Sequence, residues 1–473
     1  MSLKFIDLFA GMGGFHRALS RLGFECVFAS EIDPTLREVY TRNFEGSIEY
    51  VYGDIRENKD NIPSHDILCA GFPCQPFSKS GSRQGVLDQT RGTLFHEIID
   101  VLKRHKPQYV LLENVGNFER HDEGETWKIV RESLEKLGYT VLGTEHISSG
   151  GPGLLSPHHF GYPHSRERFF IVAKLGGLPK RPFPTPDRHH KTSLASIAQD
   201  NEELSERDRA ETTLSEGHRR CIEHWNRFLE YIPQDAALPS FPIWGDELDA
   251  TYPFENSTPF KSNSQTLRKS LNGHVGKATM TREEMLKLLP SYAQTKVIHF
   301  PKWKIDFIRQ NREWFKKHRE HLPQEWINQL RDFPASLRKL EWNCQGEPRD
   351  IWEYVLQFRP SGLRVKRYTS SPALVAMTTT QIPILGPKRR FLTRVEGLLL
   401  QGFPRTHLLP ESHEAAFRAL GNAVHVDVVE RIARTFILEE DQNLDIAATE
   451  YKQVSFDGLD DEEIASAASP THC

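Results

Sequence analysis

The sequence of 473 residues lacks several features that would place it in a class at once. It has no run of 18 apolar residues, which a transmembrane helix needs, and no apolar segment of signal-peptide length near Met1. Its six cysteines are scattered without a Cys-x-x-Cys pair, which argues against a disulfide scaffold and a zinc finger. The formal net charge of −4 gives no overall basic field. We therefore expect a cytoplasmic protein without a metal site, in which any surface for nucleic acid is local.

Two common nucleotide-binding signatures are also missing, Gly-x-Gly-x-x-Gly and the Gly-Lys-Ser/Thr of a P-loop, which argues against a nicotinamide cofactor and ATP. A different glycine-rich turn, residues 10–15, nevertheless follows a predicted strand at 4–9 and precedes helical residues 16–22. Two further predicted strands end in the acids Glu31 and Asp54. Glu31 is placed for a ribose diol and Asp54 for an adenine amino group, so three neighbouring strand ends predict a cofactor crevice.

A cysteine stands where the apolar run 66–70 is broken by Gly71-Phe72-Pro73-Cys74. Pro73 fixes its own φ and makes the turn stiff. A thiol at the carboxyl end of a strand lies where open α/β sheets bind substrates, which suits a nucleophile. An inert buried cysteine is the alternative interpretation of this residue alone.

Two later segments place further polar groups at strand ends. Glu113 ends a predicted buried strand, where a carboxyl group can hydrogen-bond or protonate a substrate nitrogen. Arg166 and Arg168, two residues apart before the apolar run 169–173, are expected to share one face of a strand. Their guanidinium groups can hold carbonyl or phosphate oxygens, and a surface ion pair with Glu167 is the alternative.

Six blocks of sequence, in this order, resemble the DNA (cytosine-5) methyltransferases. They are residues 5–14, 71–78, 113–115, 166–168, 390–404 and 421–424, so the resemblance covers residues 1–175 and 388–440. It implies an α/β fold, with a Rossmann-like S-adenosylmethionine-dependent methyltransferase domain of mostly parallel sheet and a smaller target-recognition domain. The chain departs from the family pattern at His164, where glutamine is usual, and at Ala373-Leu374, where the family has a Thr-Leu pair. Thr266-Leu267 is the alternative counterpart of that pair.

The resemblance implies a role for each residue at the strand ends. Cys74 would add to carbon 6 of cytosine, and Glu113 would bond ring nitrogen 3 and the exocyclic amine. Arg168 would hold the carbonyl oxygen at position 2, with Arg166 supporting the loop or backbone. The methyl donor would be S-adenosylmethionine, and the target base must be flipped out of the duplex.

The resemblance and the charge pattern also predict binding residues. The cofactor residues would be Phe9, Met12, Gly14, Glu31, Ile32, Asp54, Ile55, Pro73, Leu94, Asn422 and Val424. The DNA-binding residues would be Gln75, Ser78, Ser80 and Arg83 beside the predicted nucleophile, and Lys302, Lys304, Arg364 and Lys366 farther along the chain.

The chain divides by composition into predicted domains. Residues 1–186 would form the first part of the catalytic domain, 187–387 the target-recognition domain, 388–420 a hinge with a late motif, 421–440 a closing segment and 441–473 an acidic, disordered tail. Residues 296–320 hold eight Lys or Arg against three acids, and 359–367 are also basic. Trp303, Phe307 and Trp314 are spaced to share a helix face directed to the core.

The predicted function is methylation of carbon 5 of cytosine within a specific double-stranded DNA sequence. We expect a monomeric bacterial or phage enzyme of the cytosol and nucleoid, without a membrane partner. It would be either paired with a restriction endonuclease acting on the same site or solitary. One alternative is a tRNA cytosine-5 methyltransferase of the same fold, which would have a short recognition region and a Cys-Phe-Thr signature. Another is an inactive DNA reader, which would have lost Cys74 or Glu113.

Overall fold

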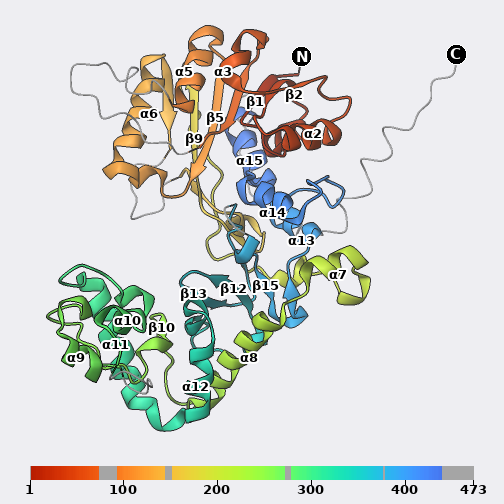
Figure 1. Cartoon of the computed structure of the whole chain (residues 1–473). Coiled ribbons are helices and arrows are strands. Elements are labelled where there is room, and N and C mark those ends of the chain that lie inside the picture. The colour runs from red at the N-terminus through yellow and green to blue at the C-terminus, as the bar shows by residue number, and fades with distance from the viewer. Residues whose placement is uncertain (1, 74–92, 144–151, 272–278, 377–378, 439–473) are drawn as a thin grey trace. The chain divides into compact units, whose positions relative to one another are not determined.

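The computed structural model describes residues 2–73, 93–143, 152–271, 279–376 and 379–438 (Figure 1). Its contacts divide the chain into two units. The first consists of Met1–Gln199, Thr369–Thr379 and Thr393–Cys473, and the second of Asp200–Tyr368 and Thr380–Leu392. Among the described residues, no helix is both long and apolar enough to cross a membrane.

The first unit is built on an eight-stranded sheet with the order β3-β2-β1-β4-β5-β9-β6, and β7 pairs with β9. The strands are β1 (Lys4–Leu8), β2 (Glu25–Ser30), β3 (Val51–Tyr52), β4 (Ile67–Gly71), β5 (Tyr109–Val115), β6 (Tyr139–Leu142), β7 (Leu154–Leu155) and β9 (Arg168–Leu175). Strands β1 to β5 run parallel, whereas β9 is antiparallel to β5, β6 and β7. The mostly parallel α/β sheet confirms the fold class that the sequence predicts.

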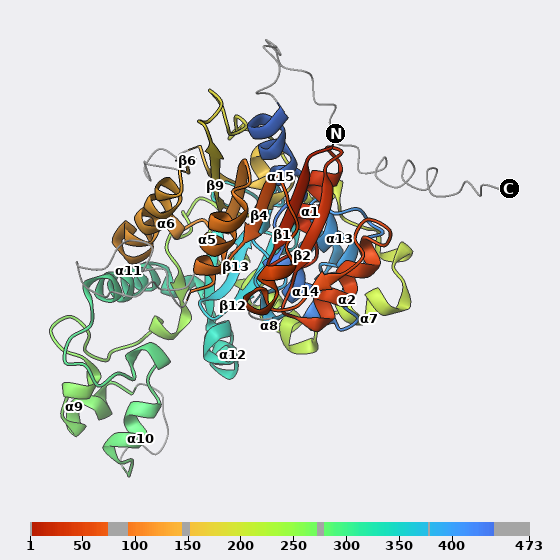
Figure 2. The same cartoon turned by 90° about the horizontal axis from the view of Figure 1, so that it is seen from above.

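Helices cover this sheet, as Figures 1 and 2 show. They are α1 (Gly14–Ser20), α2 (Pro34–Asn43), α3 (Ile55–Asn58), α5 (Leu94–His105), α6 (Glu125–Lys136), α13 (Arg394–Leu400), α14 (His413–Asn422) and α15 (Val426–Ala433). The apolar sides of α5 and α6 pack with inward residues of β1, β4, β5 and β9 in one core. The central strands are almost continuously buried, as expected for parallel strands covered on both faces.

Capping residues set the starts of helices that follow the strand ends. Asp33 accepts hydrogen bonds from the backbone of Thr35 and Leu36 ahead of Pro34, the first residue of α2. Thr93 caps α5 in the same way. Thr393 and Glu396 form a reciprocal capping box at the start of α13. At the start of these three helices, the side chain of Asp33, Thr93 or Thr393 accepts hydrogen bonds from backbone amides of the first turn.

The second unit contains a six-stranded sheet with the order β10-β11-β13-β12-β15-β16. Its strands are β10 (Ile243–Trp244), β11 (Lys339–Asn343), β12 (Val355–Arg359), β13 (Gly362–Lys366), β15 (Ile384–Leu385) and β16 (Arg390–Phe391). Its helices are α7 (Glu206–Thr212), α8 (Glu216–Tyr231), α9 (Ser264–Lys269), α10 (Arg282–Lys287), α11 (Lys302–His318) and α12 (Gln324–Asp332). One core joins the sheet to α8 and α12, and a second core joins α9, α10 and the first half of α11. We call the part around the second core, residues 244–308, the helical lobe.

The contact boundaries differ from those predicted by composition, which placed the recognition domain at 187–387. Residues 369–379 belong to the first unit because β14 (Ser371–Pro372) pairs with β8 (His164–Ser165). Residues 187–199 belong to the same unit. Composition could not locate these boundaries, because a two-residue strand pairing depends on residues about 200 positions away.

The prediction that three aromatic side chains of α11 share a core-facing side is wrong at its first residue. Trp303 is 55% exposed, whereas Phe307 packs against Trp244 and the helical lobe and Trp314 packs against the other core. In the first turn of α11, Ile305 rather than Trp303 packs against the core of the lobe. The predicted disordered tail and the last residues of the predicted strand at 139–146 lie outside the described residues.

Candidate active site

A cleft of about 540 Å³ opens where β1, β2, β4 and β5 of the first unit end. It collects nine of the eleven predicted cofactor residues, namely Phe9, Met12, Gly14, Glu31, Ile32, Pro73, Leu94, Asn422 and Val424. It also collects Glu113, Arg166 and Arg168. The other two cofactor residues, Asp54 and Ile55, line a cleft of about 300 Å³ that shares Phe9, Glu31, Ile32 and Leu94 with the first. The residues predicted from separate strand ends therefore meet at one edge of the sheet.

The glycine-rich turn after β1 has a backbone that few other residues could adopt. Gly13 has φ of 85°, and a Cβ atom there would lie 2.2 Å from the ring of Phe44. A Cβ atom on Gly14 would lie 2.5 Å from the side chain of Val424. At Gly11, by contrast, a Cβ would meet nothing within 4 Å, so this position borders open space in the cleft. The turn is thus packed on its protein side and open on its ligand side.

Glu31, directly after β2, is held by the backbone on both of its carboxylate oxygens. Oε2 accepts a hydrogen bond of 2.8 Å from the amide of Gly11, and Oε1 accepts one of 2.9 Å from the amide of Asp33. Glu31 is only 9% exposed, yet it lines both clefts. Each carboxylate oxygen can accept a second bond, which makes the pair suitable for two neighbouring hydroxyl groups.

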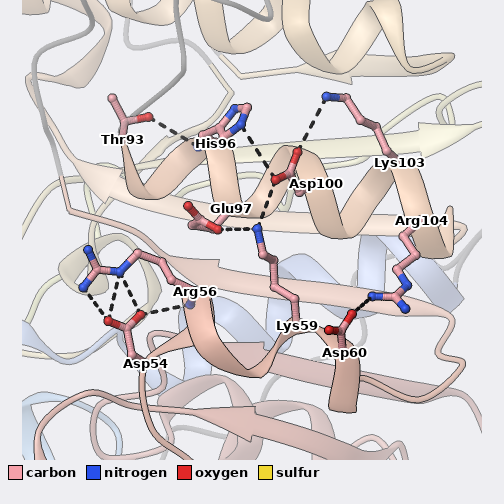
Figure 3. A network of polar contacts seen from close by, with 10 residues as sticks. All are labelled: Asp54, Arg56, Lys59, Asp60, Thr93, His96, Glu97, Asp100, Lys103 and Arg104. Carbon is pink, nitrogen blue, oxygen red and sulfur yellow. Dashed lines mark hydrogen bonds and ion pairs between the residues drawn. The ribbon is translucent and has the colours of Figure 1, made fainter.

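Asp54, the other acid at a strand end, forms a local ion pair (Figure 3). Its carboxylate accepts hydrogen bonds of 3.0 and 2.9 Å from Nε of Arg56, and the same guanidinium is ion-paired with it through Nη2. It also caps α3 by accepting from the amide of Arg56. The hydrogen bond from the Arg56 side chain is the main reason why the pKa of Asp54 is lowered. Any ligand that bonds Asp54 must share it with this guanidinium.

A second ion-pair group connects the segment after α3 to α5. Lys59 lies 2.6 Å from the carboxylate of Glu97 and 3.0 Å from that of Asp100, both on α5 (Figure 3). The first residue of α5, Leu94, lines both clefts. The ion pairs therefore hold α5 at a fixed position beside the cleft wall.

Glu113 of β5 is paired with Arg168 at the deep end of the larger cleft. Nε of Arg168 lies 2.9 Å from Oε1 of Glu113, and Glu113 is 7% exposed. Burial raises the pKa of Glu113 and outweighs the opposing charges of Arg168 and Arg166. A carboxyl group with a raised pKa can donate a proton or a hydrogen bond under conditions where an exposed glutamate could not.

Arg166 does not share a strand face with Arg168, so that prediction is wrong. β8 ends at Ser165 and β9 starts at Arg168, which leaves Arg166 in the link between them. Its guanidinium donates hydrogen bonds of 2.7 and 3.0 Å to the backbone oxygens of Gly421 and Ala423.

A third hydrogen bond from Arg166, of 3.1 Å, reaches the backbone oxygen of Leu374, in the pair nearest to the Thr-Leu pair of the family. Arg166 is 2% exposed, and burial lowers its pKa to about 9, which still leaves it charged at neutral pH. Its place in the structure is that of a support for the backbone beside Asn422.

Two residues that received no role from the sequence also hold the cleft. Nδ2 of Asn114 donates a hydrogen bond of 2.9 Å to the backbone oxygen of Phe72, in the turn that leads to Cys74. Nε2 of His407 lies 3.1 Å from the backbone oxygen of Met12. Since a carbonyl only accepts, the ring must donate from Nε2, and burial lowers the pKa of His407 to about 3, so the ring is neutral.

Several predicted residues cannot be placed in this site. Cys74, Gln75, Ser78, Ser80 and Arg83 lie outside the described residues. Lys302, Lys304, Arg364 and Lys366 belong to the second unit.

Two of these four cations are already engaged within that unit. Nε of Arg364 lies 2.8 Å from a carboxylate oxygen of Glu341, and Nζ of Lys304 donates a bond of 3.1 Å to the backbone oxygen of Tyr292. Lys366 is partly buried, which lowers its pKa. Lys302 is exposed. Phosphate contacts remain a prediction for all four, and Lys302 is the one best placed to make them.

A family model named C-5 cytosine-specific DNA methylase matches residues 3–437. The chain belongs to this family. Type II methyltransferase M.AluI of Cellulosimicrobium cellulans is 32% identical, with 92% of each chain covered. Type II methyltransferase M.BanI of Aneurinibacillus aneurinilyticus is 31% identical over 91% of this chain and 95% of its own. M.MspI of Moraxella sp. is 45% identical over 184 residues, or 39% of this chain and 41% of its own.

The protein is therefore a DNA (cytosine-5) methyltransferase, and its methyl donor is S-adenosylmethionine. The cleft fits that cofactor, because it joins a backbone-held carboxylate at Glu31 to an open glycine position and to the apolar side chains of Phe9, Ile32 and Leu94. When bound, S-adenosylmethionine supplies an electrophilic methyl group on a sulfonium. Glu31 would hold the ribose hydroxyls, and the apolar residues would cover the adenine.

Replacing Glu31 with alanine should weaken S-adenosylmethionine binding about tenfold or more, because each hydrogen bond to a charged group contributes roughly 1.5–3 kcal/mol. Isothermal titration calorimetry measures the change. Glu25→Ala, at the exposed other end of β2, is the matched control and should bind like the wild type. Unchanged affinity in Glu31→Ala would mean that the ribose does not bind here.

Replacing His407 with phenylalanine should leave the Met12 carbonyl buried and unpaired, which costs about 1–3 kcal/mol in the free energy of unfolding. We expect KM for S-adenosylmethionine to rise severalfold while KM for DNA stays unchanged. His407→Gln keeps an N–H donor and should recover most of the loss. Equal KM values for S-adenosylmethionine in the wild type and both variants would exclude a positioning role for His407.

Proposed function

We propose that this methyltransferase modifies carbon 5 of cytosine within one specific double-stranded DNA sequence, through covalent attack by Cys74 on a flipped-out base. The observation that carries the proposal is the strand register at the cleft. Gly71, the last residue of β4, stands opposite Glu113 on β5, and Cys74 follows three residues later. The register therefore supports Cys74 as the nucleophile, because Cys74 follows the strand end that stands opposite Glu113.

Four of the other five cysteines support Cys74 by their surroundings. Cys26, Cys69, Cys221 and Cys344 are all buried. Burial raises the pKa of each of these thiols, to about 12 for Cys221 and Cys344. Since the thiolate is the nucleophile, these four cannot supply it readily. Of the two remaining cysteines, Cys473 lies far from the catalytic blocks in the sequence, whereas Cys74 follows the end of β4.

The chemistry follows from the groups at the end of β5. The Cys74 thiolate forms a bond to carbon 6, and the displaced ring electrons make carbon 5 nucleophilic, while Glu113 donates a hydrogen bond or proton at ring nitrogen 3. Arg168 holds the carbonyl oxygen at position 2 and keeps Glu113 oriented. Carbon 5 then accepts the methyl group as the bond from that group to the sulfonium sulfur breaks, which leaves a neutral thioether. Loss of its proton to a base, followed by elimination, breaks the bond to carbon 6 and releases Cys74.

The biological role that we propose is protection of DNA by a monomeric cytosolic enzyme, either solitary or paired with an endonuclease that cuts the same site. M.AluI and M.BanI are named Type II methyltransferases and match more than 90% of this chain, which supports that role. The match of residues 3–437 to a DNA methylase family also favours DNA over tRNA as the substrate. The retained Cys74 and Glu113 argue against an inactive reader.

Replacing Cys74 with serine should abolish methyl transfer while the fold survives, because a hydroxyl is far less acidic than a thiol. Incorporation of tritiated methyl groups into DNA measures this. Cys344→Ala, at a buried cysteine of the second unit, should keep its activity.

The covalent bond itself can be trapped with a duplex that carries 5-fluorocytosine at the target position. In the presence of cofactor, the wild type and Cys344→Ala should form a complex that survives denaturation, and Cys74→Ser should not. A trapped complex in Cys74→Ser would place the nucleophile elsewhere.

Exchanging both segments of the second unit, Asp200–Tyr368 and Thr380–Leu392, for the corresponding regions of a relative with another target should transfer sequence specificity. The cleft belongs wholly to the first unit, so catalysis should persist in the chimera. Bisulfite sequencing of host DNA shows which cytosines carry the mark. An active chimera that still modifies the original sequence would contradict this assignment of recognition.

A further inference from the structure

The described residues include nine exposed large hydrophobic side chains. Four lie in the first unit, where Ile32 and Val115 line the active-site cleft and Tyr50 and Leu408 do not. In the second unit, five of the nine exposed large hydrophobic residues lie on the helical lobe, namely Phe260, Leu288, Val297, Ile298 and Trp303. A cluster of exposed apolar side chains is a common sign of a binding surface, so the group on the lobe calls for a partner.

Three of the five stand on one short stretch, residues 296–303, which we call the Trp303 ridge. Its sequence is Lys-Val-Ile-His-Phe-Pro-Lys-Trp, and all of its residues except Phe300 are exposed. Val297, Ile298 and Trp303 are 51%, 52% and 55% exposed. Phe300 instead belongs to the core of the lobe and anchors the ridge from below.

The backbone of the ridge is fixed to the rest of the lobe. Thr258, which is fully buried, donates from its amide to the backbone oxygen of Ile298 at 3.0 Å. Its hydroxyl donates to the backbone oxygen of Val297 at 2.5 Å. Because both carbonyls are bound inward, Val297 and Ile298 are presented to solvent on an ordered backbone, which limits the entropy lost on binding.

Lys304 supports Trp303 from within the protein. Its Nζ bonds the backbone oxygen of Tyr292 and lies 5.6 Å from the centre of the Trp303 ring and 5.3 Å from that of Phe300. The cation–π contacts hold the indole at the start of α11. Lys304 therefore supports the ridge from outside it. The indole of Trp303 remains exposed over most of its surface and can contact a partner.

The charge of the ridge is of one sign. Lys296 and Lys302 are exposed, and residues 296–303 contain no acid. The nearest acid on α11, Asp306, lies 3.3 Å from Arg309, which also binds Glu255 at 3.1 Å. The ridge thus presents two lysines and three apolar side chains, a combination that suits a partner with anionic edges and apolar faces.

We propose that the Trp303 ridge is a docking surface for duplex DNA, with Lys296 and Lys302 on phosphates and Val297, Ile298 and Trp303 against sugars and base edges. This inference rests on the proposed function, which supplies duplex DNA as the substrate. Phosphates line both edges of a DNA groove, and its sugars and thymine methyl groups offer apolar contacts. A second copy of a protein with net charge −4 would complement the lysines less well than this dense polyanion.

The test compares two ridge variants, Lys296→Ala/Lys302→Ala and Trp303→Ala, with the control Lys316→Ala/Lys317→Ala. The control lysines are exposed on the last turn of the same helix, about 20 Å from its start at 1.5 Å per residue. Fluorescence anisotropy with a labelled duplex containing the target measures Kd over a series of salt concentrations. Thermal melting checks that each variant is folded, and if Trp303→Ala is not, the lysine pair carries the test.

We expect the double lysine variant to bind duplex about tenfold more weakly and to lose about 1.8 from the slope of log K against log salt, at about 0.9 per phosphate contact. Trp303→Ala should also bind severalfold more weakly but keep the wild-type slope, since it removes no charge. The control should match the wild type in both quantities.

Wild-type affinity and slope in the ridge variants, with an enzyme that still methylates DNA, would overturn this inference and leave the proposed function standing. A wild type that neither binds nor methylates duplex would overturn the proposed function instead. Sedimentation that shows a wild-type dimer dissociated by ridge substitutions would assign the ridge to a second copy of the chain and also overturn the inference.

Discussion

The buried guanidinium of Arg166 is the interaction on which the first unit depends most. It joins the link before β9 to Leu374 and to both residues that flank Asn422, through three backbone carbonyls. A buried cation is tolerated when its N–H groups are hydrogen-bonded. Removing the guanidinium would leave the three carbonyl oxygens unpaired in the interior. Lysine could not replace Arg166. A guanidinium has planar donors in fixed directions that reach three carbonyls on two segments, whereas an ammonium group is a compact point charge.

Burial sets the chemistry at the edge of the sheet. It raises the pKa of Glu113 in spite of two neighbouring arginines, and it keeps four cysteines in the inert thiol form. The same property makes His407 a neutral donor to the cofactor turn. The free-energy cost of placing a charge in the interior therefore has three effects. It favours the protonated form of Glu113, it disfavours the thiolate of four cysteines, and it keeps His407 neutral.

The sequence predicts the sheet, its glycine turn and most of the cleft because these follow from local patterns. Buried runs ending in Glu31 and Glu113 are recognisable without knowledge of distant residues, and parallel strands bring their ends together. The role of His407 was not predictable, because the carbonyl that it bonds lies 395 positions earlier. Arg166 was assigned to a strand face for a related reason, since period-two spacing does not reveal where a strand starts. Helical spacing places Trp303 in the core, because it does not reveal which side chains near the start of a helix meet the core of the lobe.

The separation between Arg166 and its partners has a consequence for the timing of synthesis. Arg166 and Gly421 are 255 positions apart in sequence, and ribosomes add about 5–20 residues per second, so about 13–50 s pass between the two. During that time the first strands, the glycine turn and Glu113 are already made, but the backbone that carries Asn422 and Val424 does not yet exist. The nascent chain therefore holds an incomplete cofactor cleft until the segment with Asn422 and Val424 has been made.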